Sequence, residues 1–341
     1  MGRNSDRVKP IALTCGEPSG IAPEITTKAW NELRNSPAQT FFLIGDADYF
    51  SARAKSAGLS LNVSKISGTY EAAAVFQSSL PVLHRPLSVH PAAGVIEGEN
   101  AHSVISAIDE AVNLVMSGEA SALATNPVQK ETLYAAGFKH QGHTDYLSWL
   151  ARSKGHAVQE VMMLVAKDLR AVPVTVHIPL AAVAEALTTE MVIAQAQVVA
   201  NDLKKFFGVN NPRLAFTGLN PHAGENGAMG GEEQTIIVPA LEVLRRDGII
   251  VMGPLPADTA FHAEARTQYD AILCMYHDQA LIPAKTLDFH GGVNVTLGLP
   301  FVRTSPDHGT ALGIAGTGRA NPQSLIAALR LASQMAATAR G

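Results

Sequence analysis

The chain of 341 residues lacks most of the features that assign a protein to a broad class. Its two cysteines, Cys15 and Cys274, are too few for the disulfide framework of a small secreted domain. Charged residues make up 16% with a net charge of −4, which gives no electrostatic reason to expect nucleic acid. No apolar run approaches membrane-spanning length, and the start MGRNSDRVKP has no apolar signal-peptide core. We therefore expect a cytoplasmic protein with no nucleic-acid and no membrane partner.

Common cofactor and metal motifs are missing as well. No GxGxxG follows a predicted strand, so the ordinary dinucleotide fingerprint is absent. The chain has no HExxH and no CxxC pair, which removes the familiar local zinc motifs. A metal site in this chain therefore has to be assembled from residues that are distant in sequence.

The chain does have a large apolar fraction, 47%, divided into short runs that end at polar residues. Such runs are typical of buried strands in a parallel sheet. They lie at 10–14, 40–45, 80–83, 121–125, 161–166, 171–176, 213–219, 248–252 and 271–275, and the runs at 161–166 and 171–176 are candidates for a hairpin. Helical periodicity covers 103–116, 191–207 and 323–339. Strands that alternate with helices predict an α/β fold with a largely parallel sheet.

Three histidines follow strand-like runs by at most a few residues: His177, His222 and His277. Strand ends of one sheet converge on one edge, even when they are far apart in sequence. Three imidazoles in that arrangement predict a divalent-metal site with an open position for substrate. Asp258 or Asp278 is a further candidate ligand, and Asp278 is alternatively a residue that orients the neighbouring His277.

Anion-binding residues lie close to the last histidine. Lys285 and Arg303 occur in apolar stretches, where an unpaired charge is costly, and Asn294 lies between them. Arginine offers a fork for carboxylate or phosphate, and lysine offers a point charge. His143 and Thr144 form an earlier loop cluster with the same chemistry. Together these residues predict a metal-assisted site for a small, anionic, phosphorylated substrate.

Eight strings carry a resemblance to a known family: GEPSGIAPEI, TNPVQK, GHTDYL, VTVHIPL, GLNPHAGENG, GPLPADTAFH, YHDQALIPAKTL and GVNVTLGLPFVRTSPDHGT. Together they resemble the 4-hydroxythreonine-4-phosphate dehydrogenase family, from about Pro10 to the final helix. The resemblance implies oxidation of the C3 hydroxyl of 4-phosphooxy-L-threonine with NAD or NADP. Decarboxylation to 3-amino-2-oxopropyl phosphate follows, within pyridoxal phosphate (vitamin B6) biosynthesis.

The same resemblance implies an architecture and a partner. It predicts a two-lobed α/β/α fold similar to isocitrate and isopropylmalate dehydrogenases, with the active site in the interlobe cleft. Residues 1–130 with 304–341 would form the lobe with the NAD-binding loop. Residues 131–303 would form the metal- and substrate-binding, dimerisation lobe. The protein would be a homodimer with a shared active site.

Residue roles follow from the matching motifs and agree with the positional argument. The resemblance implies metal ligands at His177, His222 and His277, and substrate contacts at His143, Thr144, Lys285, Asn294 and Arg303. It implies cofactor contacts in the loop that contains His308, Gly309 and Asn321. The catalytic candidates are Lys285, Asp258 and Asp278, and Lys285 is either a proton-transfer group or an anion clamp. The metal is zinc, cobalt, nickel or magnesium, of which magnesium would prefer more oxygen ligands.

Two departures from the family pattern bear on specificity. Gly313 stands where the family's adenosine loop usually has aspartate, which affects the choice between NAD and NADP if that aspartate binds a ribose hydroxyl. Asp288-Phe289-His290 replaces the commoner Ala-Phe-Asp. Three other functions remain open: the same chemistry on D-threonate or D-erythronate 4-phosphate, a metal-dependent phosphatase, and a non-catalytic phosphate-binding protein.

Overall fold

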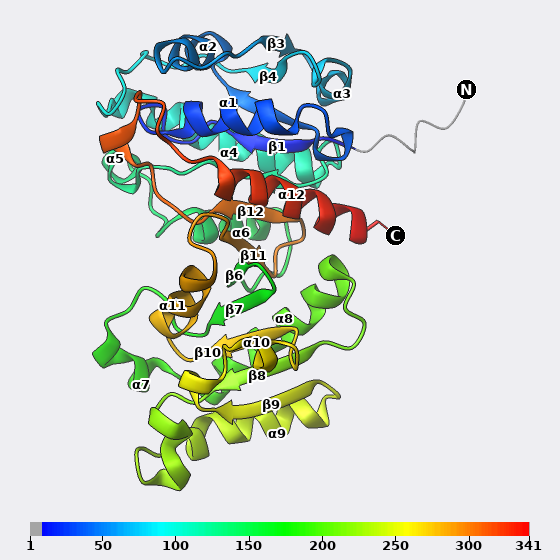
Figure 1. The fold of residues 1–341 in the computed structure, drawn as a ribbon, viewed down its shortest axis with the longest axis vertical. Coiled ribbons are helices and arrows are strands. Elements are labelled where there is room, and N and C mark those ends of the chain that lie inside the picture. Colours follow the sequence, from blue (N-terminus) through cyan, green and yellow to red (C-terminus); the bar gives the residue numbers. More distant parts are fainter. Residues whose placement is uncertain (1–8, 341) are drawn as a thin grey trace, which may run out of the picture. The chain divides into compact units, whose positions relative to one another are not determined.

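The structure, a computed structural model, describes residues 9–340. Most of the N-terminal segment on which the signal-peptide expectation rests lies outside the described residues. The chain divides into two units (Figure 1): Met1–Val158 with Leu299–Ala337, and Gln159–Gly298 with Thr338–Gly341. We call them unit 1 and unit 2. None of the helices within residues 9–340 is long and apolar enough to cross a membrane.

Unit 1 contains six strands among the described residues, in the order β3-β4-β2-β1-β5-β12 and all parallel. They are β1 (Ile11–Thr14), β2 (Phe41–Gly45), β3 (Val63–Ile66), β4 (Leu80–His84), β5 (Leu123–Ala124) and β12 (Arg303–Pro306). Every residue of β1 and β2 is buried, which is why their sequences are uninterrupted apolar runs. The sequence did not predict β3 or β12, because VSKI and RTSP have no such run.

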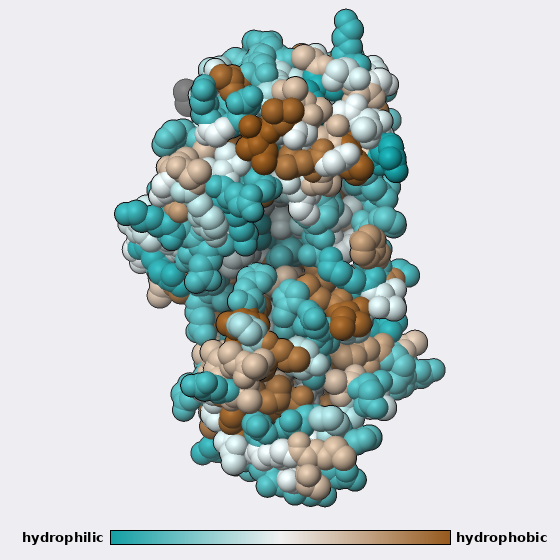
Figure 2. Space-filling model, turned by 90° about the vertical axis from the view of Figure 1, so that its left-hand side faces the viewer, coloured by the Kyte–Doolittle hydropathy of each residue, from teal (hydrophilic) through white to brown (hydrophobic). Residues whose placement is uncertain are grey.

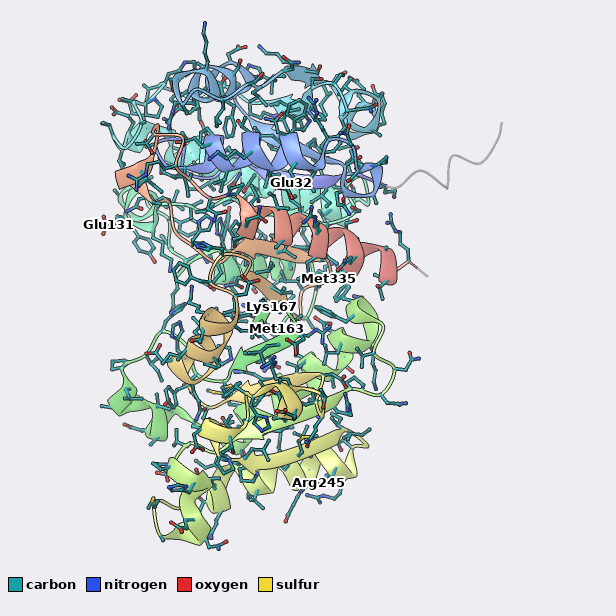
Figure 3. The ribbon with its side chains drawn as sticks, in the orientation of Figure 1. Glu32, Glu131, Met163, Lys167, Arg245 and Met335 are labelled. Carbon is teal, nitrogen blue, oxygen red and sulfur yellow. The ribbon has the colours of Figure 1, made fainter. Side chains whose placement is uncertain are left out.

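The helices of unit 1 are α1 (Ala22–Leu33), α2 (Ala47–Ser56), α3 (Ala72–Val75), α4 (Ala101–Met116), α5 (Lys130–Ala135), α6 (His143–Ser153) and α12 (Gln323–Thr338). Helix α1 has Pro23 in its first turn, where the missing N–H has no intrahelical acceptor to lose. Glu32 near its end, labelled in Figure 3, accepts a hydrogen bond from Arg330 of α12 at 2.9 Å. The first and last helices of the chain are thereby joined within unit 1.

Unit 2 contains six further strands among the described residues, in the order β11-β6-β7-β10-β8-β9. They are β6 (Val161–Ala166), β7 (Leu169–Pro173), β8 (Arg213–Thr217), β9 (Ile250–Leu255), β10 (Ala271–Cys274) and β11 (Val293–Leu297). Strand β6 is antiparallel to β7 and to β11, and the other pairs are parallel. The predicted hairpin is confirmed, with Lys167 at a φ of 52° in its two-residue turn. The α/β class and the largely parallel sheet are confirmed in both units.

The helices of unit 2 are α7 (Val183–Ala186), α8 (Thr189–Phe207), α9 (Val238–Arg246), α10 (Ala263–Arg266) and α11 (His277–Leu287). Thr188 caps α8 through Met191 N, and Gly208 ends it at a φ of 69°. The core of the unit packs apolar side chains of β6, β7, β8 and β10 against α11. Pro283 lies inside α11. Because proline is unfavourable inside a helix, the sequence did not predict this one.

The unit boundaries differ from the expected lobes in three segments. Residues 299–303, expected in the second lobe, belong to unit 1, and residues 338–341, expected in the first, belong to unit 2. The largest difference is the segment 131–158, which was expected in the second lobe and belongs to unit 1. The physical reason is that α5 and α6 pack against α4, and the Tyr146 hydroxyl of α6 donates a hydrogen bond to Asp109 of α4. The predicted position of the active site between lobes and the dimerisation role stay predictions.

Candidate functional site

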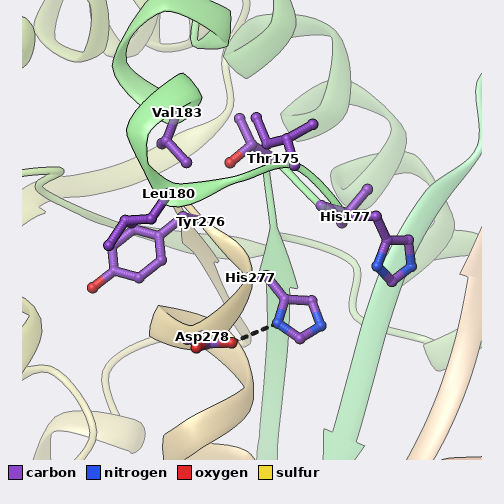
Figure 4. Close-up of a pocket in the computed structure, with 9 residues that line it drawn as sticks. Thr175, His177, Leu180, Val183, Tyr276, His277 and Asp278 are labelled. Carbon is purple, nitrogen blue, oxygen red and sulfur yellow. Dashed lines mark hydrogen bonds and ion pairs between the residues drawn. The ribbon is translucent and has the colours of Figure 1, made fainter.

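Two of the three histidines expected as metal ligands lie side by side in unit 2. The rings of His177 and His277 have centroids 5.7 Å apart at 44° (Figure 4). His177 follows β7, and His277 begins α11 directly after β10. Because β7 and β10 are parallel neighbours, their carboxyl ends lie together and bring both imidazoles to one place. The tyrosine before His277, Tyr276, points to the opposite side, toward Leu180 (Figure 4).

Asp278 determines how His277 presents its ring. An Asp278 carboxylate oxygen lies 2.7 Å from Nδ1 of His277, which leaves Nε2 as the ligand atom. A carboxylate behind an imidazole is the usual arrangement in metal-binding histidines. Both rings border a cavity of about 220 Å³ that is also lined by Thr175. Two imidazoles, one of them hydrogen-bonded to a carboxylate, fit zinc, cobalt or nickel better than magnesium.

His222 lies in an unusual segment of unit 2, between β8 and α9. His222, Ala223, Gly224, Glu225 and Asn226 have φ angles between 43° and 78°, a left-handed turn in which four residues are not glycine. His177 also has a positive φ, 28°. Non-glycine residues in this region are strained, and such strain is concentrated at functional sites. Within residues 9–340 of one chain, the ligand atoms of the three histidines do not all lie within 4.8 Å of one another.

Three other potential ligands in unit 1 do lie within that distance: Asp46, Asp48 and His84. Sequence reasoning did not find this group. Asp46 already accepts hydrogen bonds from the backbone of Asp48, Tyr49 and Leu87, so its carboxylate caps α2 and fastens the loop after β4. The group is therefore explained by helix capping.

Arg303 and His143 lie close together in unit 1 and form a candidate anion-binding group. The Arg303 side chain is 3% exposed and donates from Nη2 to Thr125 Oγ1 at 2.7 Å. Burial lowers the pKa of Arg303 to about 10. Burial also lowers the pKa of His143 to about 3, helped by the charges of Arg303 and Lys130. Nε2 of His143 is buried and has no hydrogen-bond partner among the described residues, so this atom can contact a ligand.

Thr125 and Lys130 belong to this group but were not singled out by the sequence analysis. Thr125 is fully buried after β5, and Lys130 begins α5. The string TNPVQK contained both residues, and only their position relative to Arg303 identifies them. Thr144, the next residue after His143 on α6, is half-buried.

The remaining predicted substrate and catalytic residues lie in unit 2. The Lys285 ammonium of α11 lies 5.8 Å from the centroid of the exposed Phe289 ring. Asn294 is half-buried on β11, and its Oδ1 has no hydrogen-bond partner among residues 9–340. Asp258 follows β9 and lines a second cavity, of about 550 Å³, together with Asp278.

The segment 308–322, which we call the cofactor loop, lies in unit 1. Nε2 of His308 is buried with no hydrogen-bond partner within residues 9–340, and Nδ1 lies 3.0 Å from Gly309 O. A Cβ built on Gly309 or Gly313 would meet no atom within 4 Å. An unpartnered imidazole nitrogen and open backbone suit the hydroxyl-rich adenosine of a nicotinamide cofactor. Asn321 Oδ1, by contrast, accepts from Gln323 N at the start of α12 and so already caps that helix.

Fold and site together define the class: a two-unit α/β protein with paired imidazoles at adjacent strand ends and a buried guanidinium-based anion site. A family model described as "Pyridoxal phosphate biosynthetic protein PdxA" matches residues 37–332. The chain belongs to this family.

Relatives and solved structures agree with that assignment. The chain is 50% identical over 337 residues to a 4-hydroxythreonine-4-phosphate dehydrogenase of Bradyrhizobium diazoefficiens, covering 96% of this chain and 97% of the relative. It is 51% identical to one of Caulobacter vibrioides, with 96% and 98% coverage. A crystal structure of 4-hydroxythreonine-4-phosphate dehydrogenase from Klebsiella pneumoniae matches with a TM-score of 0.87 and 35% identity, covering 98% of this chain and 99% of that one. The resemblance read from the sequence is confirmed.

Proposed function

We propose that the chain is an NAD(P)-dependent dehydrogenase acting on 4-phosphooxy-L-threonine. It would oxidise the C3 hydroxyl, and the resulting β-keto acid would lose carbon dioxide to yield 3-amino-2-oxopropyl phosphate. The observation that carries this proposal is the His177–His277 pair with Asp278 behind it, in a chain whose relatives are named for this activity. We also propose a cytoplasmic homodimer with a shared site.

The phosphate would bind to the anion-binding group of unit 1. Arg303 supplies a permanent charge and a planar fork of donors, which suits two phosphate oxygens. His143, neutral at physiological pH because of its lowered pKa, supplies an N–H donor and no charge. Thr125 would help to orient the guanidinium by accepting a hydrogen bond from its Nη2. Lys130 adds a second positive charge close to His143.

His177, His222 and His277 would hold one divalent metal, with ligands contributed by both subunits of the homodimer because the three do not meet within residues 9–340 of one chain, and with Asp278 keeping the His277 ring in place. Bound there, the metal would act as a Lewis acid that lowers the pKa of the substrate alcohol and stabilises charge during decarboxylation. A nicotinamide cofactor at the cofactor loop would supply the hydride acceptor. Asn294, with its unpartnered Oδ1, would accept a hydrogen bond from the substrate's ammonium or hydroxyl group.

Two roles remain for Lys285. A neutral Nζ would take the alcohol proton as hydride leaves C3, whereas a charged Nζ would hold the carboxylate or phosphate. Lys285→Arg keeps the charge and removes the base. A loss of kcat with an unchanged KM would support the proton-transfer role, and full activity would support the clamp.

The test of the proposed function is a substrate panel with purified protein. We expect NADH formation with 4-phosphooxy-L-threonine, no release of inorganic phosphate, and little turnover of D-threonate or D-erythronate 4-phosphate. Asp278→Asn should weaken Co²⁺ affinity by about 10- to 100-fold. Asp247→Asn on the surface of unit 2 serves as the control, because Asp247 lies after α9 and binds Gln197.

Two of the three alternatives have their own outcome in this panel. Turnover of D-threonate or D-erythronate 4-phosphate alone would mean that the enzyme performs the same chemistry on a sugar acid phosphate. Phosphate release without NADH would favour a phosphatase. Co²⁺ binding that is unaffected by His177→Ala and His277→Ala would remove the metal site from the proposal.

A further inference from the structure

We propose that Glu24 and Lys28 of α1 are positioning residues that hold the cofactor loop in its binding conformation. The Glu24 carboxylate accepts hydrogen bonds from Gly316 N and, at 2.9 Å, from Gly318 N. Lys28 Nζ donates to Gly318 O and to Ala320 O, each at 2.7 Å. One helix therefore holds both the N–H and the C=O groups of one short loop segment.

The two side chains can act together because they are four residues apart on α1. Positions i and i+4 lie on the same helix face, so a carboxylate and an ammonium at this spacing reach neighbouring peptide groups. Glu24 is fully buried, where a carboxylate needs donors to be stable. The loop amides supply two donors, and Arg53 Nη2 lies 3.9 Å from the same carboxylate. The bonds are charge-assisted and therefore strong.

The loop is also confined on its other sides. Gly316 and Gly318 have φ angles of 79° and 71°, which other residues adopt only with strain. A Cβ on Gly316 would lie 2.6 Å from Ala93 Cβ, and one on Gly318 would lie 2.9 Å from Ala57 O. The backbone thus packs closely against Ala93 and Ala57, and the polar groups of α1 bind its N–H and C=O groups.

This inference rests on the proposed function, because the cofactor loop has that role only by resemblance. Glu24 and Lys28 fix the shape of the loop backbone that would contact the cofactor. Their removal should weaken cofactor binding and leave the imidazole pair of unit 2 unchanged.

The test compares Lys28→Met and Glu24→Gln with Glu32→Gln, an exposed glutamate on the same helix that pairs with Arg330. NADH affinity is measured by fluorescence titration, Co²⁺ affinity by absorption, and loop opening by hydrogen exchange at 312–320. We expect Lys28→Met and Glu24→Gln to weaken NADH binding by about tenfold or more, with Co²⁺ affinity unchanged. Lys28→Arg, which keeps a cationic donor, should recover most of the loss.

The outcomes separate this inference from the proposed function. If wild-type protein binds no NADH, the proposed function fails, and the proposed role of Glu24 and Lys28 in cofactor binding fails with it. If wild type binds NADH and both variants bind it equally well, the inference alone is overturned, even if loop exchange is faster. A merely structural role would lower the melting temperature and weaken NADH and Co²⁺ binding alike, which also contradicts it. Lys28→Met keeps the test available if Glu24→Gln folds poorly, because Lys28 is only half-buried.

Discussion

His143 and Arg303 lie next to each other in unit 1, and burial changes the proton affinity of both side chains in the same direction. For Arg303 the pKa falls to about 10, so the guanidinium remains charged at neutral pH. For His143 the pKa falls from 6.5 to about 3, so the imidazole is neutral at neutral pH. The pair therefore offers one fixed charge and one neutral donor, and an anionic ligand would be stabilised mainly by Arg303 together with the nearby Lys130.

The shift of His143 predicts an acid-sensitive contribution to stability. Below pH 6.5 the unfolded chain binds a proton at this residue and the folded chain does not, until the pH nears 3. The free energy of unfolding should therefore fall with decreasing pH across this range, by up to about 1.4 kcal/mol per pH unit. His143→Gln should remove this part of the slope in urea titrations between about pH 7.5 and pH 4.5.

His102→Gln provides the matched control, since His102 is exposed on α4. Its pH profile should follow that of the wild type. Parallel profiles for all three proteins would mean that His143 titrates normally in the folded state.

At the scale of elements, the left-handed turn at 222–226 is held by the helical segment that follows it in the chain. Glu233, which is 3% exposed, accepts from the backbone N of Asn220 at 2.7 Å and from its side chain at 3.1 Å. It begins a π-helical turn, Glu233–Ile237, directly before α9. A π-helical turn is rare and often occurs at functional sites. Glu233 thus fixes the residue at which the strained segment containing His222 begins.

Gly224→Ala should destabilise this turn. Gly224 has a φ of 78°, and an added Cβ would lie 2.4 Å from Glu233 Oε2. The free energy of unfolding should fall by about 1–2 kcal/mol, measured from urea midpoints. Gly231→Ala, with open space around its Cβ and no positive φ, should change it by less than about 0.5 kcal/mol.

A double mutant separates the clash from the backbone strain. If the clash contributes, Gly224→Ala should cost less in a Glu233→Ala background than alone. Additive effects would assign the whole cost to the backbone.

At the scale of the whole molecule, unit 2 leaves large apolar side chains exposed. Leu180 is 71% exposed and Ile282 is 64% exposed. Figure 2 shows one face of the molecule, on which hydrophobic residues lie exposed among hydrophilic ones. Leu180 lines the cavity that His277 borders, Ile282 lines the cavity that Asp258 borders, and Asp278 lines both. Apolar surface at a functional site is typical of a region that another chain covers. This supports the proposed homodimer with a shared site.

Sedimentation should therefore give a mass of about twice the 35.9 kDa of one chain. Leu180→Asp combined with Ile282→Asp should yield monomers and weaken Co²⁺ binding, because the site would lose its partner. Tyr70→Asp, at an equally exposed aromatic residue of unit 1, should leave both properties unchanged. A variant that is monomeric but binds Co²⁺ normally would show that one chain holds the metal alone.

Much of the fold could be predicted because buried parallel strands must be apolar on both faces. The runs that became β1, β2 and β10 are visible for that reason, and so are the histidines placed beyond β7 and β10. Elements whose sequences interrupt the apolar pattern, such as β12 with the buried Arg303 or α11 with Pro283, cannot be recognised in this way. Their identity depends on neighbours that are distant in sequence.

The sequence by itself therefore determined the α/β class, the family and the residue types available at each strand end. Hydrophobic periodicity and local motifs are properties of short segments, so they can be read without coordinates. Only the tertiary structure decided that His177 and His277 are neighbours, that Thr125 contacts Arg303, and that Glu24 and Lys28 hold the cofactor loop. These contacts join residues as many as 294 positions apart, and packing alone brings such residues together.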